Sequence, residues 1–480
     1  MSFNHLKNAF IGNEISYINA LGVKVKRIYL DSAASTLALL PAQQATQDFL
    51  NFYSNTHSSV HLTAKISTQT IAWAEQSILS FFGANQGYSI AFKGSGATAP
   101  LNRLANGIHK LQPDKNTVLI SLMEHHSNDL PHRIHNNNVV HIPIHDQAGN
   151  FQGINLEAIE QLCQEHQGNL SYIAVTAASN VSGHISPIYD IAEIAHKYGA
   201  YIVVDGAQIA AHAPIQLQQD DPNRSIDFFV FSGHKVYTPG SPGVLIAKTE
   251  LLNKMEPEYY GGGMVSAVST FDYQVAEESF DKEHAGTINI PGIFSLATTL
   301  EFLKQIGMET IFAKEKALTD YLIGKLRELP QINVYCDTPN IKRIGAVSFN
   351  AAGIPHQLLS QILNDYFGIA VRNDCFCAHP FVRECLTDEL WEIEDEQDVP
   401  LYQGMVRASL GLYSDESDID VLCNALYQIT SNKTEYISQY HQTPNHQFEH
   451  LTYSVDGSQY FDVNQILDKS FTPFLNARSL

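Results

Sequence analysis

Lys235 has a clear capacity for chemistry because of its position after a buried strand. The apolar run 228–231 predicts a strand buried on both faces, and it leads through the turn Ser232-Gly233-His234 directly into Lys235. Two prolines and two glycines follow and hold the backbone in a fixed, non-helical course, which can keep the amine out of water. Desolvation lowers the pKa of a lysine and makes its amine a nucleophile toward carbonyl carbons. The alternative is an ordinary solvated lysine on a surface loop.

A second buried strand supplies a carboxylate. Residues 200–208 read Ala-Tyr-Ile-Val-Val-Asp-Gly-Ala-Gln, which places Asp205 at the carboxyl end of that strand. In open α/β sheets ligands bind beyond the carboxyl ends of the strands, so we expect Asp205 and Lys235 to face one ligand. Pyridoxal 5'-phosphate requires a lysine that forms an imine and a carboxylate that keeps the pyridine nitrogen protonated.

Together with further motifs in the same order, these segments resemble the class V aminotransferases, a family of fold-type I pyridoxal-phosphate enzymes. The resemblance extends from about Tyr29 to Tyr413 and is closest to the cysteine desulfurase and selenocysteine lyase branch. It implies an α/β fold with a mostly parallel, seven-stranded sheet in a large domain and a smaller α+β C-terminal domain. It also implies pyridoxal 5'-phosphate as the cofactor and a small amino acid as the substrate.

A loop with two glycines is the candidate phosphate site. Gly94 and Gly96 precede an expected helix, whose first backbone N–H groups are free to bind an anion. The same glycines also fit a dinucleotide-binding fingerprint, with Glu124 as a possible partner for a ribose. In the resembling family this loop holds the cofactor phosphate, which implies that role here for Ala97 and Thr98.

The resemblance implies the remaining cofactor contacts residue by residue. His125, in the segment Glu-His-His-Ser-Asn, is expected to stack on the pyridine ring and could also move protons. Asn180 is expected at the phenolic oxygen or at the substrate carboxylate. Gln208 is expected at the ring oxygen beside the imine. Ser232 and His234 are expected to contact the phosphate. Thr287 is expected to reach the cofactor phosphate of a neighbouring subunit, which implies a homodimer with shared sites.

Cys377 and two arginines decide which reaction is expected. Residues 371–380 read Val-Arg-Asn-Asp-Cys-Phe-Cys-Ala-His-Pro and resemble a family segment whose cysteine takes sulfur from the substrate as a persulfide. The aligned residue is Cys377, which implies a cysteine desulfurase that converts L-cysteine or L-selenocysteine to L-alanine, with a possible sulfur-acceptor protein. Arg372 and Arg407 are the candidates to bind the substrate carboxylate, because a guanidinium pairs with a carboxylate through two hydrogen bonds.

Other interpretations stay open at this segment. Without a persulfide on Cys377, the chain would be a class V aminotransferase or a lyase acting on another amino acid. Two further interpretations belong to a different class. The glycine loop would support a nucleotide-binding protein, and a zinc protein would use Cys375, Cys377, His379 and Cys385. A Cys-x-Cys pair lacks the two-residue spacing of a zinc knuckle, so no metal is expected. The positions that depart from the family pattern near the site are Ala99, Asn373 and Asp374.

The elements that must position these residues follow from the hydrophobic pattern. Strands and helices alternate through the first 290 residues or so, which predicts a mostly parallel sheet covered on both faces. Near 295 the pattern changes to long amphipathic helices with short strands. The predicted organisation begins with an N-terminal helical segment (1–25) that packs on the small domain and has its main helix at 13–21. A cofactor-binding large domain (26–295), a small α+β domain (296–430) and a C-terminal extension of unknown role (431–480) follow.

Composition limits the function classes. The chain has 480 residues and a net charge of −21, so more than one domain is expected and a nucleic-acid partner is disfavoured by charge repulsion. The first residues lack the pattern of a signal peptide, and no apolar run approaches the length of a membrane span. Six scattered cysteines form no disulfide framework, which favours a reduced, cytoplasmic compartment.

Overall fold

The larger part of the chain is organised around a seven-stranded sheet. A computed structural model describes residues 3–56, 58, 60–84, 86–135, 138–146, 150–339, 341–391 and 399–475. In order across the sheet the strands are β4 (Tyr88–Lys93), β10 (Gly243–Lys248), β9 (Phe228–Ser232), β8 (Tyr201–Asp205), β7 (Leu170–Thr176), β5 (Thr117–Ser121) and β6 (Asn138–Ile142). From β9 to β6 all neighbours are parallel, which confirms the predicted mostly parallel α/β sheet.

Strand β10 was not predicted from the sequence, and it is the one that breaks the parallel order of this sheet. It pairs antiparallel with both β4 and β9, so that Gly243 stands opposite Lys93 on one side and Ser232 on the other. Its sequence, Gly-Val-Leu-Ile-Ala-Lys, begins directly after Pro242, at the end of a segment expected to be irregular. The insertion places the Gly94–Gly96 loop beside the turn that carries Lys235.

Helices cover both faces of this sheet, as the alternation of strand side chains requires. Val203 and Val204, adjacent on β8, belong to different cores on opposite faces. The helices packed on the Val203 face are α3 (Thr98–Leu111) and α7 (Thr249–Lys254). Those packed on the Val204 face are α2 (Leu62–Phe81), α5 (Leu156–Glu165), α6 (Ile188–Lys197) and α9 (Ile290–Ile306), with α1 (Leu40–Phe49) against α9.

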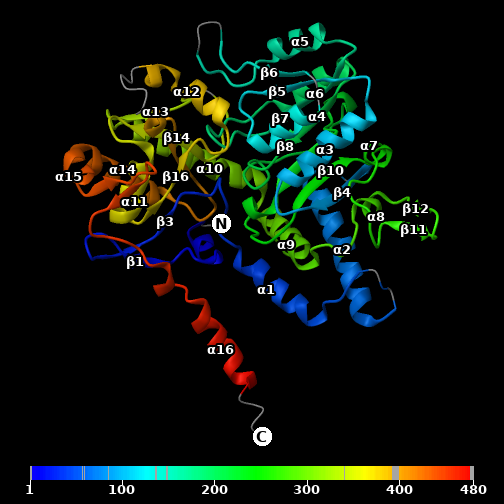
Figure 1. Cartoon of the computed structure of the whole chain (residues 1–480), viewed down its shortest axis with the longest axis horizontal. Coiled ribbons are helices and arrows are strands. Elements are labelled where there is room, and N and C mark those ends of the chain that lie inside the picture. The colour runs from blue at the N-terminus through cyan, green and yellow to red at the C-terminus, as the bar shows by residue number, and fades with distance from the viewer. Residues whose placement is uncertain are drawn as a thin grey trace.

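A second, smaller group of elements follows α9 and lies beside the first (Figure 1). Its antiparallel sheet has the order β13 (Ile332–Val334), β14 (Ala346–Ala351), β17 (Met405–Ser409) and β16 (Arg372–Asp374). The helices of this group are α10 (Met308–Arg327), α11 (His356–Phe367), α12 (His379–Trp391), α13 (Val399–Tyr402) and α14 (Glu416–Ser431). Leu322, Phe349, Leu359 and Leu422 are buried together in its core.

The predicted N-terminal helix at 13–21 is wrong. The described start of the chain is a 3-10 segment, Phe3–Ala9, followed by a hairpin of β1 (Ser16–Ile18) and β2 (Lys24–Lys26). Asn19 forms the turn, because its side-chain oxygen accepts the backbone N–H groups of Leu21 and Val23 at 3.0 and 2.9 Å. Contacts to α11 then favour the extended form, including a 2.9 Å hydrogen bond from Tyr17 Oη to Asn364 Oδ1.

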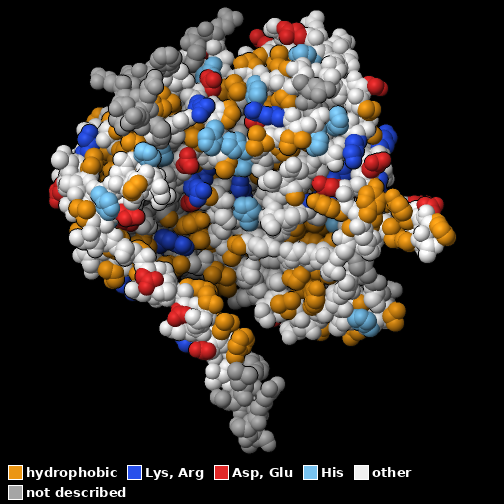
Figure 2. Space-filling view, viewed as in Figure 1, with side chains coloured by type: hydrophobic (Ala, Val, Ile, Leu, Met, Phe, Trp, Pro, Cys, Tyr) orange, Lys and Arg blue, Asp and Glu red, His pale blue; other side chains and the backbone are white. Residues whose placement is uncertain are grey.

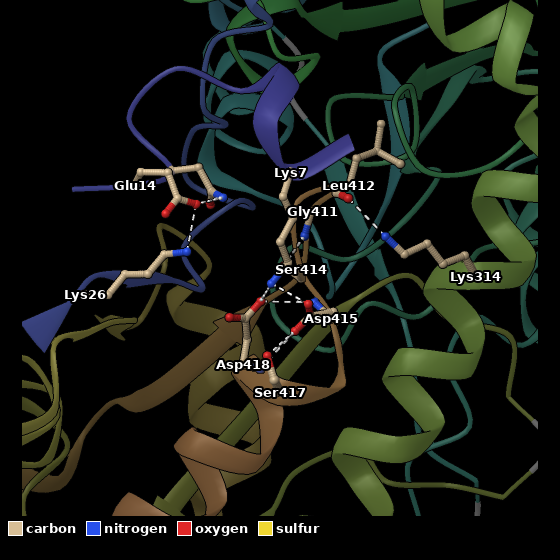
Figure 3. Close-up of polar contacts among 11 residues, drawn as sticks. Lys7, Glu14, Lys26, Lys314, Gly411, Leu412, Ser414, Asp415, Ser417 and Asp418 are labelled. Atoms are coloured by element: carbon tan, nitrogen blue, oxygen red, sulfur yellow. Dashed lines mark hydrogen bonds and ion pairs between the residues drawn. The ribbon is translucent and has the colours of Figure 1, made fainter. Parts of the chain in front are cut away.

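Ion pairs fasten this N-terminal segment to the smaller group (Figure 3). Lys7 Nζ lies 2.5 Å from Asp415 Oδ2 and 3.0 Å from Asp418 Oδ2, and Asp415 caps the N-terminus of α14. Burial acts to raise the pKa of Asp415, but hydrogen bonds from Lys7 and Ser417 outweigh it and lower the pKa to about 2. Nearby, Lys314 of α10 donates to the carbonyl of Leu412 at 3.0 Å.

Several shorter elements complete the described chain. They are β3 (Ile28–Tyr29), which pairs with β15 (Ile369–Ala370), the short helices α4 (Leu130–His135) and α8 (Ser279–Glu283), and the hairpin β11 (Val265–Val268) and β12 (Tyr273–Val275). After residue 431 the elements are α15 (Lys433–Ile437), β18 (Tyr440–Gln442), β19 (Phe448–His450) and α16 (Val463–Leu475). In Figure 1 α16 projects away from the rest. The described helices include none that is both long and apolar enough to span a membrane.

Candidate active site

Neighbouring strand ends build one cavity between the two groups of elements. Asp205 ends β8, Ser232 ends β9, and Thr176 ends β7; these three strands are adjacent and parallel, so their carboxyl ends meet. The cavity has a volume of about 290 Å³. The predicted site residues that line it are Ala97, Thr98, His125, Asn180, Asp205, Gln208, Ser232, His234, Lys235, Arg372, Cys377 and Arg407. In Figure 2, histidine, lysine and arginine side chains gather between the two halves of the visible face.

Lys235 and Asp205 form the electrostatic centre of the cavity. Burial lowers the pKa of Lys235 to about 8, while the charge of Asp205 opposes this effect. Asp205 is only 3% exposed, and burial raises its pKa, opposed by a 2.9 Å hydrogen bond from the N–H of Ala207 and by Lys235. A lysine with a lowered pKa has a neutral, nucleophilic fraction near neutral pH. The amine of Lys235 and the carboxylate of Asp205 therefore line one cavity.

A polar cradle lies where the loop before α3 meets the turn after β9. The N–H of Ala97 donates to Ser232 Oγ at 2.8 Å, and Thr98 Oγ1 lies 2.7 Å from Ser127 Oγ. Gly96 leaves this cradle open, since a Cβ there would lie 3.3 Å from Ser232 Oγ and 3.5 Å from His234 Nε2. The hydroxyls, the imidazole and the free N–H groups at the start of α3 are a donor set suited to a phosphate.

His125 lies against the same cavity in a neutral form. Burial, together with the charge of Lys235, lowers its pKa to about 3. The N–H of Ser127 donates to His125 Nδ1 at 3.1 Å, which leaves the ring proton on Nε2. A neutral imidazole of fixed tautomer suits stacking on an electron-poor ring, the role implied for it by the family resemblance.

The suggested ribose role of Glu124 is wrong, because its carboxyl group is buried in the protein. It accepts hydrogen bonds from Ser121 Oγ, from Asn128 Nδ2 at 2.6 Å and from the N–H of Thr176 at 2.9 Å. Burial raises its pKa to about 8. Glu124 therefore ties the His125 segment to the end of β7 and has no free face for a nucleotide.

The opposite wall of the cavity comes from the smaller group and centres on Arg407. This residue is 2% exposed, donates from Nη1 to the carbonyl of Asn180 at 2.7 Å, and places Nη2 3.4 Å from Asp31 Oδ1. Burial lowers its pKa to about 10, opposed by Asp31. Arg407 Nε has no hydrogen-bond partner among the described residues, so a donor is free for an anionic ligand. Arg372 stands directly opposite Arg407 across the β16–β17 pair, and its side chain is exposed.

Cys377 lies at the mouth of the cavity with its side chain exposed. Phe376 and Cys377 hold left-handed backbone conformations, with φ of 51° and 55°. Two hydrogen bonds from the large sheet's side fix this loop. Asn180 Nδ2 donates to the carbonyl of Phe376 at 2.8 Å, and the N–H of His126 donates to the carbonyl of Cys377 at 2.7 Å. The thiol is thus presented to the cavity by a loop anchored on its backbone.

The four residues suggested as a zinc cluster point to different partners. Cys375 is buried and its thiol lies 3.3 Å from the carbonyl of Gln403, whereas Cys385 Sγ lies 3.2 Å from Cys336 Sγ. His379 instead stacks on His126. Within the described ranges there is no group of three side chains placed to hold a metal ion.

Thr287 does not line the described cavity; it is exposed and accepts a 3.1 Å hydrogen bond from Asn55. Conversely, the sequence interpretation gave no role to several residues that do line it, namely Ser127, Thr176, Ala207 and Phe376. Thr176 is the last residue of β7, and Ser127 lies in the segment after β5, so their position at or beyond strand ends is the signal that could have identified them.

These residues fit pyridoxal 5'-phosphate. The cradle of Ser232 and His234 suits its phosphate, Asp205 suits a protonated pyridine nitrogen, and Lys235 suits its aldehyde. The free Arg407 Nε suits the carboxylate of an amino acid beside it.

Comparisons with known proteins agree with this chemistry. The profile of the family described as "Aminotransferase class-V" matches residues 28–422. A "Probable cysteine desulfurase" of Halalkalibacterium halodurans is 33% identical over 406 residues, which is 83% of this chain and 92% of the relative. A "Cysteine desulfurase" of Dickeya dadantii is 32% identical over 408 residues, 84% of this chain and 91% of the relative.

Solved structures show the same fold. An apo cysteine desulfurase from Thermococcus onnurineus superposes with a TM-score of 0.73 at 26% identity, covering 84% of this chain and 95% of that one. The cysteine desulfurase CsdA from Escherichia coli, in an S-sulfonic acid form, gives a TM-score of 0.73 at 26% identity and covers 90% of this chain and 99% of that one.

Proposed function

Because the chain belongs to the class V aminotransferase family of pyridoxal-phosphate enzymes, we propose that it is a cysteine desulfurase. It removes sulfur from L-cysteine, or selenium from L-selenocysteine, and releases L-alanine, with Cys377 as the acceptor. The observation that carries the proposal is that Lys235, Asp205, Arg407 and Cys377 line one cavity of about 290 Å³.

In this proposal the large-sheet wall holds the cofactor. Ala97, Thr98, Ser232 and His234 bind its phosphate, and Asp205 pairs with its pyridine nitrogen. Asn180 and Gln208 contact the ring oxygen, and His125 covers the ring face. When bound, pyridoxal phosphate withdraws electrons from the substrate and so stabilises negative charge on its Cα.

Lys235 is the acid and base of the reaction. Its pKa of about 8 lets the amine take a proton from the substrate Cα and return one to Cβ near neutral pH. Arg407 and Arg372 orient the substrate by its carboxylate. The low exposure of Arg407 excludes water from that pairing and so strengthens it.

Cys377 takes the sulfur. Its thiolate attacks the sulfur of the bound cysteine: an S–S bond forms, the Cβ–S bond breaks, and its electron pair accepts a proton at Cβ to give alanine. Its exposed position allows the persulfide to be offered to an acceptor protein. The support for this step is the exposure of Cys377 at the cavity mouth.

Mass spectrometry of the peptide that contains Cys377, after one turnover with L-cysteine, tests the proposal. The mass of one added sulfur atom on Cys377 is expected, together with one equivalent of alanine. Cys375→Ser is the matched control on the same peptide and keeps the added sulfur, whereas Cys377→Ser loses it. Alanine formation that persists in Cys377→Ser would assign a lyase, and amino transfer to a keto acid would assign an aminotransferase.

We also propose that the chain works as a homodimer in which Thr287 reaches the cofactor phosphate of the neighbouring subunit. The support is its exposure outside the cavity of its own chain, together with the exposed apolar side chains of the hairpin β11–β12, such as Phe271, which is 98% exposed. Light scattering after size exclusion tests this, and a monomer with full activity would contradict it.

A further inference from the structure

Two thiols outside the active site lie in contact. Cys336 Sγ and Cys385 Sγ are 3.2 Å apart, although the residues are separated by 49 positions, and both side chains are half-buried. A disulfide requires about 2.05 Å between sulfurs, so the atoms need to approach by only about 1 Å more. The proposed desulfurase reaction uses neither thiol.

The contact belongs to an ordered seam between α12 and the end of β13. One helical turn after Cys385, Glu389 accepts hydrogen bonds from Tyr335 Oη at 2.8 and 2.7 Å and from Asn333 Nδ2 at 3.1 Å. Residues four apart lie on the same face of a helix, so these bonds hold Cys385 against the turn that carries Cys336. The seam therefore keeps the two sulfurs in register.

We propose that Cys336 and Cys385 are a reversible dithiol–disulfide pair, oxidised by hydrogen peroxide and reduced by a small thiol. The Cys336 thiolate attacks a peroxide oxygen: the S–O bond forms, the O–O bond breaks, and the leaving oxygen departs as water. The sulfur of Cys385 then displaces the hydroxyl from Cys336, which leaves as a second water with the proton of Cys385. Two thiols and one peroxide thus give one disulfide and two waters.

The contact between the two thiols affects the ionisation of Cys385. The hydrogen bond with Cys336, followed by burial, raises the pKa of Cys385 well above its usual range. The same disulfide and two waters form whichever of the two thiols attacks the peroxide first.

The bond has a mechanical consequence for the catalytic loop. Helix α12 begins at His379, two residues after Cys377, and the disulfide would close a loop that contains the whole segment from Cys336 to Cys385. Oxidation therefore fixes both ends of the segment that carries Cys377 and restrains its movement.

Peptide mapping in a Cys377→Ser background tests the bond without interference from the active-site thiol. After peroxide treatment and alkylation, we expect loss of two hydrogen masses, a linked peptide containing Cys336 and Cys385, and reversal by dithiothreitol. Cys385→Ser and Cys336→Ser each abolish the linked peptide, and Cys163→Ser, a buried cysteine of α5, leaves it intact. If both thiols alkylate freely after oxidation, or if either links to Cys375 instead, the proposal is overturned.

Hydrogen exchange measures the consequence. Oxidation is expected to slow exchange of the amides in 375–390, and the change is expected to disappear in Cys385→Ser. If amide exchange in 375–390 is unchanged in a protein shown to carry the disulfide, the inference that the bond restrains the loop is overturned. Because neither readout uses enzyme activity, failure here is distinguishable from failure of the desulfurase proposal.

Discussion

The two walls of the cavity are built in different ways. The wall that contains Asp205, Ser232 and Lys235 rises from the ends of adjacent parallel strands, inside a sheet buried on both faces. The wall that contains Arg372 and Cys377 is an exposed strand and a loop with left-handed residues, held by backbone hydrogen bonds to the first wall. The first wall, here called the rigid wall, therefore suits a cofactor that stays bound. The second, here called the exposed wall, suits a substrate and a sulfur atom that must leave.

Lys235→Ala is expected to have the largest effect. Loss of both the amine that captures the aldehyde and the acid–base group should reduce turnover by at least about 10³-fold. Alanine release from L-cysteine measures the rate, and absorbance shows loss of the yellow lysine-bound cofactor. If Lys235→Ala kept turnover within about tenfold of wild type, the assignment of the acid–base chemistry to the rigid wall would be wrong.

Asp205→Asn is expected to have the next largest effect. The amide can still accept the N–H of Ala207, so the fold and cofactor binding are retained. Loss of the charge that keeps the pyridine nitrogen protonated should slow turnover by on the order of 10²-fold. Activity and cofactor content are measured together, because loss of cofactor would indicate a binding role instead.

Arg372→Lys tests the exposed wall. A lysine keeps the charge but cannot form the paired hydrogen bonds to a carboxylate, so kcat/KM for L-cysteine should fall by about tenfold, the equivalent of roughly 1.4 kcal/mol. Arg327→Lys, at a surface pair with Asp337, is the matched control and should leave kcat/KM unchanged. If Arg372→Lys lowered activity as much as Asp205→Asn does, the two walls would no longer differ in their importance for the reaction.

Lys7→Met is expected to have the smallest effect, on stability alone. The Lys7–Asp415 pair is partly exposed, so its loss should cost less than about 1 kcal/mol. Asp415 has a folded pKa of about 2, below its ordinary 3.8, so the pair stabilises the protein above about pH 4 and the contribution fades as the pH falls toward 2. Melting temperatures of wild type and variant should therefore converge in acid. Lys26→Met, at the exposed pair with Glu14 (Figure 3), is the control and should show no such convergence.

The sequence predicted the rigid wall better than the exposed one. Strand 170–176 and the strand ends at Asp205 and Ser232 follow from long apolar runs, because burial on both faces leaves little choice of conformation. The predicted helix at 13–21 failed because contacts with α11 override a weak local preference. The contact of Cys336 with Cys385 could not be predicted, since it joins residues 49 positions apart that only the tertiary fold brings together.

Strand β10 has a consequence for the order in which the protein matures. Its Gly243 packs so closely on the carbonyl oxygen of Gly96 that a Cβ there would collide with it, although the two glycines are far apart in the chain. We therefore expect the Gly94–Gly96 loop to gain its shape only after β10 has entered between β4 and β9. If this loop binds the cofactor phosphate, as we propose, we expect a nascent chain still lacking residues 243–248 to bind pyridoxal phosphate only after those residues have joined the sheet.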